Sequence, residues 1–163
     1  SMSLGGSGSS TTESNAFASL ASAGILNIAA AGNAGNSSLS YPASYSSVMS
    51  VAAVDEYKQR ASFSQYNSQV EIAGPGVSVY STVPTSKGKY GYKSGTSMAT
   101  PHVSAVAALV WSYFPTCTAA QMRASLTKSA LDLGSAGRDT KYGFGLVQAK
   151  AARDRIASLG CGN

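Results

Sequence analysis

Two apolar runs dominate the first third of the chain. Residues Ile25–Ala31 and Val48–Val54 contain one polar side chain each, which is typical of parallel strands covered on both faces. Ser1–Leu4 reads as the end of an earlier strand, and a helical apolar stripe over 16–21 then ends at Gly24. A strand, a helix and a strand at this spacing predict a βαβ unit with two parallel strands.

The second half of the chain contains a longer helical pattern. Residues 97–114 form an apolar run with several small side chains, and Pro101 falls in its first turn, where a missing N–H costs little. Thr118 and Gln121 have the spacing of a capping box, which predicts a helix to about residue 130. We further expect strands over 70–73 and 77–81, a turn over 74–76, a short hairpin near 63, a loop over 80–94 and a helix over 146–159.

These elements predict one α/β domain over residues 1–163, with a mostly parallel sheet and a central buried helix. Hydrophobic residues make up 44% of the chain and charged residues 12%, a composition too apolar for a disordered protein. The net charge of +5 is scattered apart from a loose set at Lys87, Lys89 and Lys93, so we expect a solvated surface and no nucleic-acid partner. No apolar run is long enough to span a bilayer, so no membrane partner is expected.

Candidate chemistry lies where the predicted strands end. Gly5 and Gly6 follow the first strand, Gly32 and Asn33 follow the second, and open α/β sheets bind ligands at this carboxyl edge. Ser97 lies at the predicted start of the long helix, where unpaired N–H groups and a partial positive charge would favour attack on a carbonyl. An ordinary helix-capping serine is the alternative for this position, and a turn asparagine is the alternative for Asn33.

Three stretches together resemble a known family, the subtilisin-like serine proteases. Residues 95–103 read Gly-Thr-Ser-Met-Ala-Thr-Pro-His-Val and resemble the nucleophile motif of that family. Residues 1–6 resemble its substrate-binding strand, and residues 29–33 resemble the segment that carries its oxyanion asparagine. The likeness extends to Tyr142–Val147, so it covers nearly the whole chain and implies part of a three-layer subtilisin-like fold.

The resemblance implies roles for individual residues. Ser97 would be the nucleophile, and the Asn33 side chain would bind the oxyanion together with the Ser97 backbone N–H. Polypeptide substrates would be bound by one short strand and by the wall opposite it: Ser3, Leu4, Gly5, Ala30, Ala31 and Gly32. The neighbouring Ala34 and Ser40 are small and uncharged, so we expect a medium or large apolar residue before the cleaved bond.

A base for Ser97 is not evident in this sequence. The single histidine, His102, lies five positions later on the same predicted helix, so it points about 140° away from Ser97. A Ser97–Lys93 dyad is disfavoured because Lys93 has no sign of burial. An esterase of the α/β-hydrolase type is disfavoured because Gly95–Ala99 lacks the final glycine of that elbow.

The family places its catalytic aspartate and histidine before the substrate-binding strand. We therefore expect a serine endopeptidase whose Asp and His come from a missing or separate N-terminal segment of the same protease. The alternative is an inert fragment that folds or self-associates through an exposed sheet edge.

Cys117 and Cys161 match neither a zinc-binding nor a redox spacing. We expect a disulfide between them and a secreted protein, with two free thiols as the alternative. The resemblance implies no catalytic cofactor, and we assign no metal ligand among the candidate site residues. It also suggests one structural calcium site, built from Ala43, Tyr45 and Val48 carbonyls near Glu71, with plain surface loops as the alternative.

Overall fold

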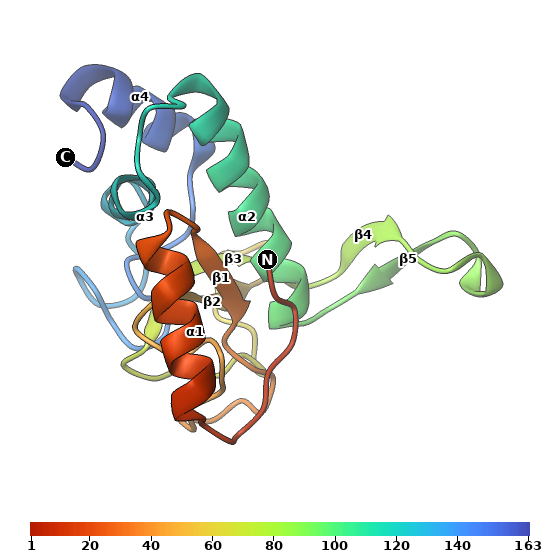
Figure 1. Cartoon of the computed structure of the whole chain (residues 1–163). Helices are drawn as coiled ribbons and strands as arrows, with labels where there is room; N and C mark the ends of the chain where they lie inside the picture. Colours follow the sequence, from red (N-terminus) through yellow and green to blue (C-terminus); the bar gives the residue numbers. More distant parts are fainter.

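The computed structural model describes residues 1–163 and contains a three-stranded parallel sheet (Figure 1). Its strands are β1 (Asn27–Ala30), β2 (Val48–Val54) and β3 (Val70–Pro75), in the order β1-β2-β3. Every residue of β2 is buried, as expected for a strand packed on both faces. The predicted parallel strands are therefore confirmed.

Single parallel bridges extend this sheet at both edges. Met2 pairs with Ala29 of β1, and Leu146 pairs with Ala73 of β3. The first bridge completes the βαβ unit predicted from the sequence, because the chain passes from Met2 through a helix to β1. It also holds Ser3 and Leu4 at the carboxyl edge of the sheet.

Helices cover both faces of the sheet (Figure 1). On one face, Phe17 of α1 (Thr11–Ser22) packs against a buried cluster that includes Ala29 and Val48. On the other face lies α2 (Thr96–Tyr113), followed by α3 (Ala119–Lys128) and α4 (Ala149–Leu159). The chain therefore has the expected three layers, helix, sheet and helix.

The main core lies between the sheet and α2. Met49, Ile72 and Val103 are fully buried in its largest cluster, which also receives side chains from α3 and α4. Only the inner side of α2 takes part, because Ala105 and Leu109 on its outer side are exposed. The predicted central helix is thus buried on one side and open on the other.

Local signals explain several helix ends. Thr118 and Gln121 form the predicted capping box, in which each side chain bonds the backbone N–H of the other residue. The Ser10 hydroxyl caps α1 by accepting from the Glu13 N–H. The predicted start of the last helix at residue 146 is wrong by three residues. Leu146 instead pairs with Leu131 through two backbone hydrogen bonds, so α4 begins at Ala149.

The segment expected to be a loop over 80–94 is a protruding antiparallel hairpin (Figure 1). It consists of β4 (Val79–Thr82) and β5 (Tyr90–Lys93), joined through the short 3-10 helix η1 (Thr85–Lys87). Serines, glycine and lysines obscured its strand pattern, because the exposed hairpin has no buried face to require alternating apolar residues. The hairpin expected near residue 63 is instead an irregular segment with turns.

The structure contains the expected disulfide between Cys117 and Cys161. Their Cα atoms are 5.6 Å apart, and the bond connects the start of the α3 region to the end of the chain after α4. The Trp111 indole N–H donates to the Cys117 carbonyl at 2.8 Å. The three C-terminal helices are therefore joined by covalent and polar contacts as well as by apolar packing.

Candidate active site

Ser97 is the second residue of α2, and its position depends on a close approach between helix and sheet. The Gly95 N–H donates to the Gly76 carbonyl at 2.8 Å. A Cβ on Gly76 would crowd Ala53 of β2 and the Gly95 carbonyl, so only glycine lets the helix start so close to the strand. The helix N-terminus therefore opens directly above the carboxyl edge of the sheet.

Asn33 lies beside that helix start, and Thr96 fixes its orientation. The Thr96 N–H and the Thr96 hydroxyl both donate to Asn33 Oδ1 at 2.9 Å. Because two donors converge on this atom, it must be the oxygen of the carboxamide. The Asn33 Nδ2 group is therefore left free to donate to a ligand.

A second donor is available at the same place. In the first turn of α2, the Met98 N–H bonds the Gly95 carbonyl at 3.0 Å, whereas the Ser97 N–H has no acceptor in the protein. This is one of the free amide groups at a helix N-terminus, where a partial positive charge also favours an anion. Asn33 Nδ2 and the Ser97 N–H together can stabilise a negatively charged oxygen.

The segment from Ser3 to Gly5 runs past Ser97 as an exposed edge. The Ser3 hydroxyl donates to the Ser97 carbonyl at 2.7 Å, and the Ser97 hydroxyl donates to the Ser3 carbonyl at 3.3 Å. Leu4 is 60% exposed, and its backbone has no hydrogen-bond partner in the protein. An extended peptide could add to this edge as a further strand.

A groove of about 440 Å³ connects these groups. It brings together Ser97, Asn33 and the expected wall residues Leu4, Gly5, Ala30, Gly32, Ala34 and Ser40. Ser3 contacts Ser97 but does not line the groove, and Ala31 is 2% exposed and packs into the core. No residue of the groove carries a charge, so the structure offers no acid to bind a basic side chain.

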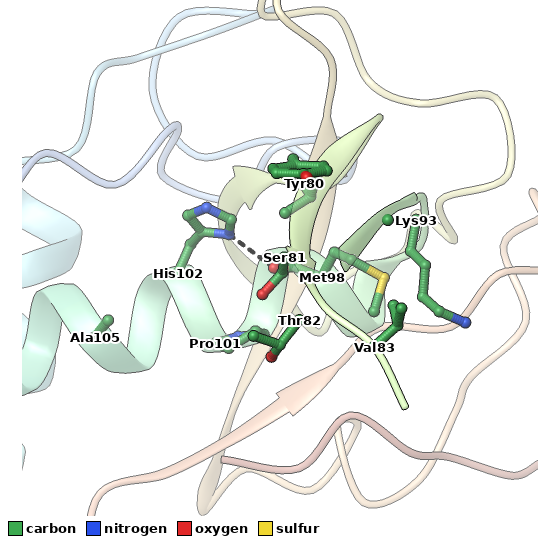
Figure 2. Close-up of a pocket in the computed structure, with 11 residues that line it drawn as sticks. Tyr80, Ser81, Thr82, Val83, Lys93, Met98, Pro101, His102 and Ala105 are labelled. Atoms are coloured by element: carbon green, nitrogen blue, oxygen red, sulfur yellow. Dashed lines mark hydrogen bonds between the residues drawn. The ribbon is translucent and has the colours of Figure 1, made fainter. Parts of the chain in front are cut away.

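No base contacts the Ser97 hydroxyl in this chain. The His102 ring points back along α2, where its Nδ1 lies 2.8 Å from the Met98 carbonyl (Figure 2). His102 and Lys93 both line a different groove of about 380 Å³, between the β4–β5 hairpin and α2. The arrangement is therefore a serine hydroxyl beside two free N–H donors, without a proton acceptor.

Sequence reasoning gave no role to Thr96 and Gln65, the residues that hold Asn33 and its loop in place. Thr96 orients Asn33, and its place between Gly95 and Ser97 was the only hint of such a role. Gln65 also lines the groove of Ser97 and is 5% exposed. It comes from an irregular segment that no sequence pattern linked to the site.

The candidate calcium ligands are largely used by another cation. The Arg123 guanidinium forms an ion pair with Glu71 and donates to the Val48 carbonyl at 3.2 Å and the Ser46 carbonyl at 3.0 Å. The Tyr45 carbonyl accepts from the Val48 N–H at 2.9 Å. This set does not fit a calcium ion, because a guanidinium already neutralises the single carboxylate it offers.

Comparisons with known proteins agree with this geometry. A sequence model of the subtilase family matches residues 1–145. Subtilisin DY of Bacillus licheniformis is 46% identical over 155 residues, which are 93% of this chain and 55% of that protein. The thermostable alkaline protease of Halalkalibacterium halodurans is 50% identical over 151 residues, 93% of this chain and 40% of that protein.

A solved structure shows the same fold. The psychrophilic subtilisin-like protease Apa1 from the Antarctic psychrotroph Pseudoalteromonas sp. AS-11 superposes with a TM-score of 0.94 at 30% identity. The match covers 99% of this chain and 71% of that chain. The present chain spans about half, or less, of the length of the two relatives above. The family match and the two relatives show that the chain belongs to the subtilase family.

Proposed function

We propose that this chain is the C-terminal portion of the catalytic domain of a serine endopeptidase, with Ser97 as its nucleophile. The single observation that carries the proposal is the free pair of donors, Asn33 Nδ2 and the Ser97 N–H, beside the Ser97 hydroxyl. The subtilisins that resemble the chain support the reaction type.

The reaction begins when a peptide lies along Ser3–Gly5. Ser97 Oγ bonds to the carbonyl carbon of the peptide, and its proton passes to a histidine of a second segment. The carbonyl oxygen becomes an oxyanion that accepts from Asn33 Nδ2 and the Ser97 N–H. The carbon–nitrogen bond then breaks, the amine leaves with the histidine proton, and an acyl group remains on Ser97.

The acyl group is removed by the same steps with water in place of the amine. The histidine takes a proton from water, the water oxygen bonds to the acyl carbon, and Ser97 Oγ leaves with the proton. Before substrate binds, the Ser97 hydroxyl has only the Ser3 carbonyl as a partner, and a carbonyl oxygen cannot serve as a base. The isolated chain should therefore react slowly.

The missing base defines the main partner. The aspartate and histidine of the triad would come from an N-terminal segment of the same protease, supplied as a separate or preceding polypeptide. Two features support this partner. The outer side of α2, which includes Ala105 and Leu109, is exposed. The groove between the β4–β5 hairpin and α2 is lined by Met98, the residue that follows Ser97. A segment that covers this face could place a histidine next to Ser97.

The proposal extends to the substrate, the cofactor requirement and the location of the protein. Substrates are polypeptides, and the reaction needs no cofactor because the oxyanion is stabilised by hydrogen bonds alone. The disulfide between Cys117 and Cys161 supports secretion, since such bonds persist in oxidising compartments. None of the helices has the length and the apolar character needed to cross a membrane.

Labelling with a fluorophosphonate tests the proposal, with imidazole added as an external base. We expect one adduct per chain, located on Ser97 by peptide mass, and no adduct in Ser97→Ala. Ser104→Ala is the matched control, because Ser104 lies on the same helix with its hydroxyl bonded to Thr100, and it should label normally. If the adduct is absent both with imidazole and after co-expression with the N-terminal segment, the chain is an inert fragment.

A further inference from the structure

Gln65 contributes a nearly buried carboxamide to the groove that contains Ser97. Its side chain is 5% exposed, and it lines the groove together with Ser38 and Ser40. Gln65 belongs to the irregular segment after Arg60, which lies behind the loop that follows β1. A buried carboxamide at this place is costly unless its polar atoms are bonded.

Three hydrogen bonds hold Gln65 against the loop that carries Asn33. Its backbone N–H donates to the Gly32 carbonyl at 3.0 Å, and its Oε1 accepts from the Ala34 N–H at 3.4 Å. Its Nε2 donates to the Ser38 carbonyl at 2.7 Å. The carboxamide also lies so close to Gly32, whose φ is +107°, that any Cβ there would overlap it.

These contacts leave Gln65 with unused hydrogen-bonding capacity. A carboxamide nitrogen carries two N–H donors, and only one of them has an acceptor in the protein. No charged group lines the groove, and its apolar side chains are Leu4, Ala30, Ala34 and Leu39. A ligand side chain that enters this groove therefore meets neutral walls, and Gln65 Nε2 has one N–H without an acceptor in the protein.

We propose that Gln65 determines specificity, so that the groove prefers an uncharged substrate side chain with a terminal hydrogen-bond acceptor, glutamine above all, before the cleaved bond. The inference rests on the proposed function, because it takes this groove as the peptide site. It departs from the apolar preference expected from the sequence. The methylene part of such a side chain packs between Leu4 and Ala30, while its carbonyl accepts from Gln65 Nε2.

Binding of product-like peptides tests this preference without any need for catalysis. The probes are acetyl-Ala-Ala-Ala-Xaa peptides with free carboxylates, where Xaa is Gln, Leu or Glu. Titration into the full chain is followed by ¹H–¹⁵N resonances, including the side-chain amide of Gln65. We expect the Gln peptide to bind roughly 2- to 10-fold more tightly than the other two, as one hydrogen bond allows. Only the Gln peptide should shift the Gln65 side-chain resonance.

Two variants separate recognition from support of the loop. Gln65→Met keeps the length of the side chain and removes the donor, so the Gln and Leu peptides should then bind equally. Gln69→Met is the matched control, because Gln69 lies four positions away and does not line the groove; it should keep the preference. If Gln65→Met does not fold, the peptide series on the unchanged protein still decides.

The outcomes distinguish this inference from the proposed function. Equal binding of the three peptides, with shifts at Ser97 and Asn33, would overturn the role of Gln65 and leave the peptide site intact. An absence of shifts at Ser97 and Asn33 with every peptide would instead contradict the peptide site itself. A preference for the Glu or Leu peptide would overturn the role assigned to the Gln65 donor.

Discussion

The two sides of Ser97 differ in how completely this chain builds them. On one side, the loop after β1 is bonded to α2 through Thr96 and to the segment behind it through Gln65. On the other side, the β4–β5 hairpin projects from the body, and the outer face of α2 is open (Figure 1). The side that carries Asn33, which we call the oxyanion side, has both of its donors in this chain. The side of the β4–β5 hairpin, where a base would lie, has a groove but no base.

In the proposed mechanism, the two halves of the catalytic group therefore have different structural origins. The oxyanion donors come from the end of β1 and the start of α2, which the parallel sheet and its packed helix bring together. In the proposed mechanism the base approaches from the open side, carried by a segment that packs against the outer face of α2. Nucleophile and oxyanion site can therefore be formed before the triad is complete.

Asn33→Leu should cause the largest effect and would break the claim for the oxyanion side. We expect the imidazole-assisted reaction of Ser97 with p-nitrophenyl acetate to slow by about 10²–10³, a magnitude known for the same type of substitution in subtilisin and not calculated from this structure. Stopped-flow acylation rates measure it. Asn36→Leu, which changes a nearby groove residue, should react at nearly the normal rate; equal rates in all three proteins would refute the role of Asn33.

Thr96→Val tests whether the orientation of Asn33 matters. The variant keeps the shape of the side chain but removes the hydroxyl donor to Asn33 Oδ1 and the acceptor for the Gly32 N–H. We expect acylation to slow by roughly 10-fold, since one lost hydrogen bond to a positioned group costs about 1–2 kcal/mol. Thr96→Ser should restore most of the rate, and failure of that rescue would argue against orientation by the hydroxyl.

Arg123→Met tests the ion pair at the amino edge of the sheet, the edge opposite to Ser97. It leaves the Glu71 carboxylate, whose side chain is 14% exposed, without its cation, so we expect a loss of about 1–3 kcal/mol in the free energy of unfolding. A chelator should not shift the melting temperature of the unchanged protein. The chelator should lower the melting temperature of the variant, because Glu71 and the freed carbonyls could then bind calcium. Calorimetric scans with calcium and with chelator measure the melting temperatures of both proteins. A lower melting temperature of the unchanged protein with chelator would contradict the claim that Arg123 occupies this site in place of calcium.

Alkaline pH should produce the smallest effect. Burial raises the pKa of the Tyr45 hydroxyl above its usual value of 10.0, so the folded protein retains a proton that the unfolded chain loses. The free energy of unfolding should therefore fall as pH rises above about 10. Tyr45→Phe should reduce this fall, whereas Tyr57→Phe should not, because Tyr57 is 76% exposed. Denaturant unfolding at several pH values measures the slopes, and identical slopes would contradict the prediction.

The sequence predicted the elements that are packed and regular. The buried runs became β1 and β2, the long apolar run became α2, and the spacing of Thr118 and Gln121 marked the start of α3. These signals are local, because burial on two faces and helix capping both act over a few neighbouring residues. The motif around Ser97 likewise located the candidate nucleophile within one contiguous stretch.

The parts that the sequence did not reveal depend on contacts between distant segments. Gln65 carries no signal of its own, and its place in the groove follows from bonds to a loop about thirty residues earlier. The contact of Arg123 with Glu71 spans 52 positions. The strand expected over 77–81 is largely β4, but its partner β5 with Tyr92 was missed because the exposed hairpin has no buried face.

The most direct test of the account is the dependence of Ser97 acylation on an external base. The acylation rate with p-nitrophenyl acetate is measured at increasing imidazole for the unchanged chain and for Ser97→Ala, with the reaction of imidazole alone subtracted. We predict slow acylation without imidazole, a rate that rises with its concentration, and no protein-dependent rise in Ser97→Ala. A fast reaction without imidazole would show that this chain contains its own base, and an equal rise in Ser97→Ala would show that Ser97 is not the nucleophile.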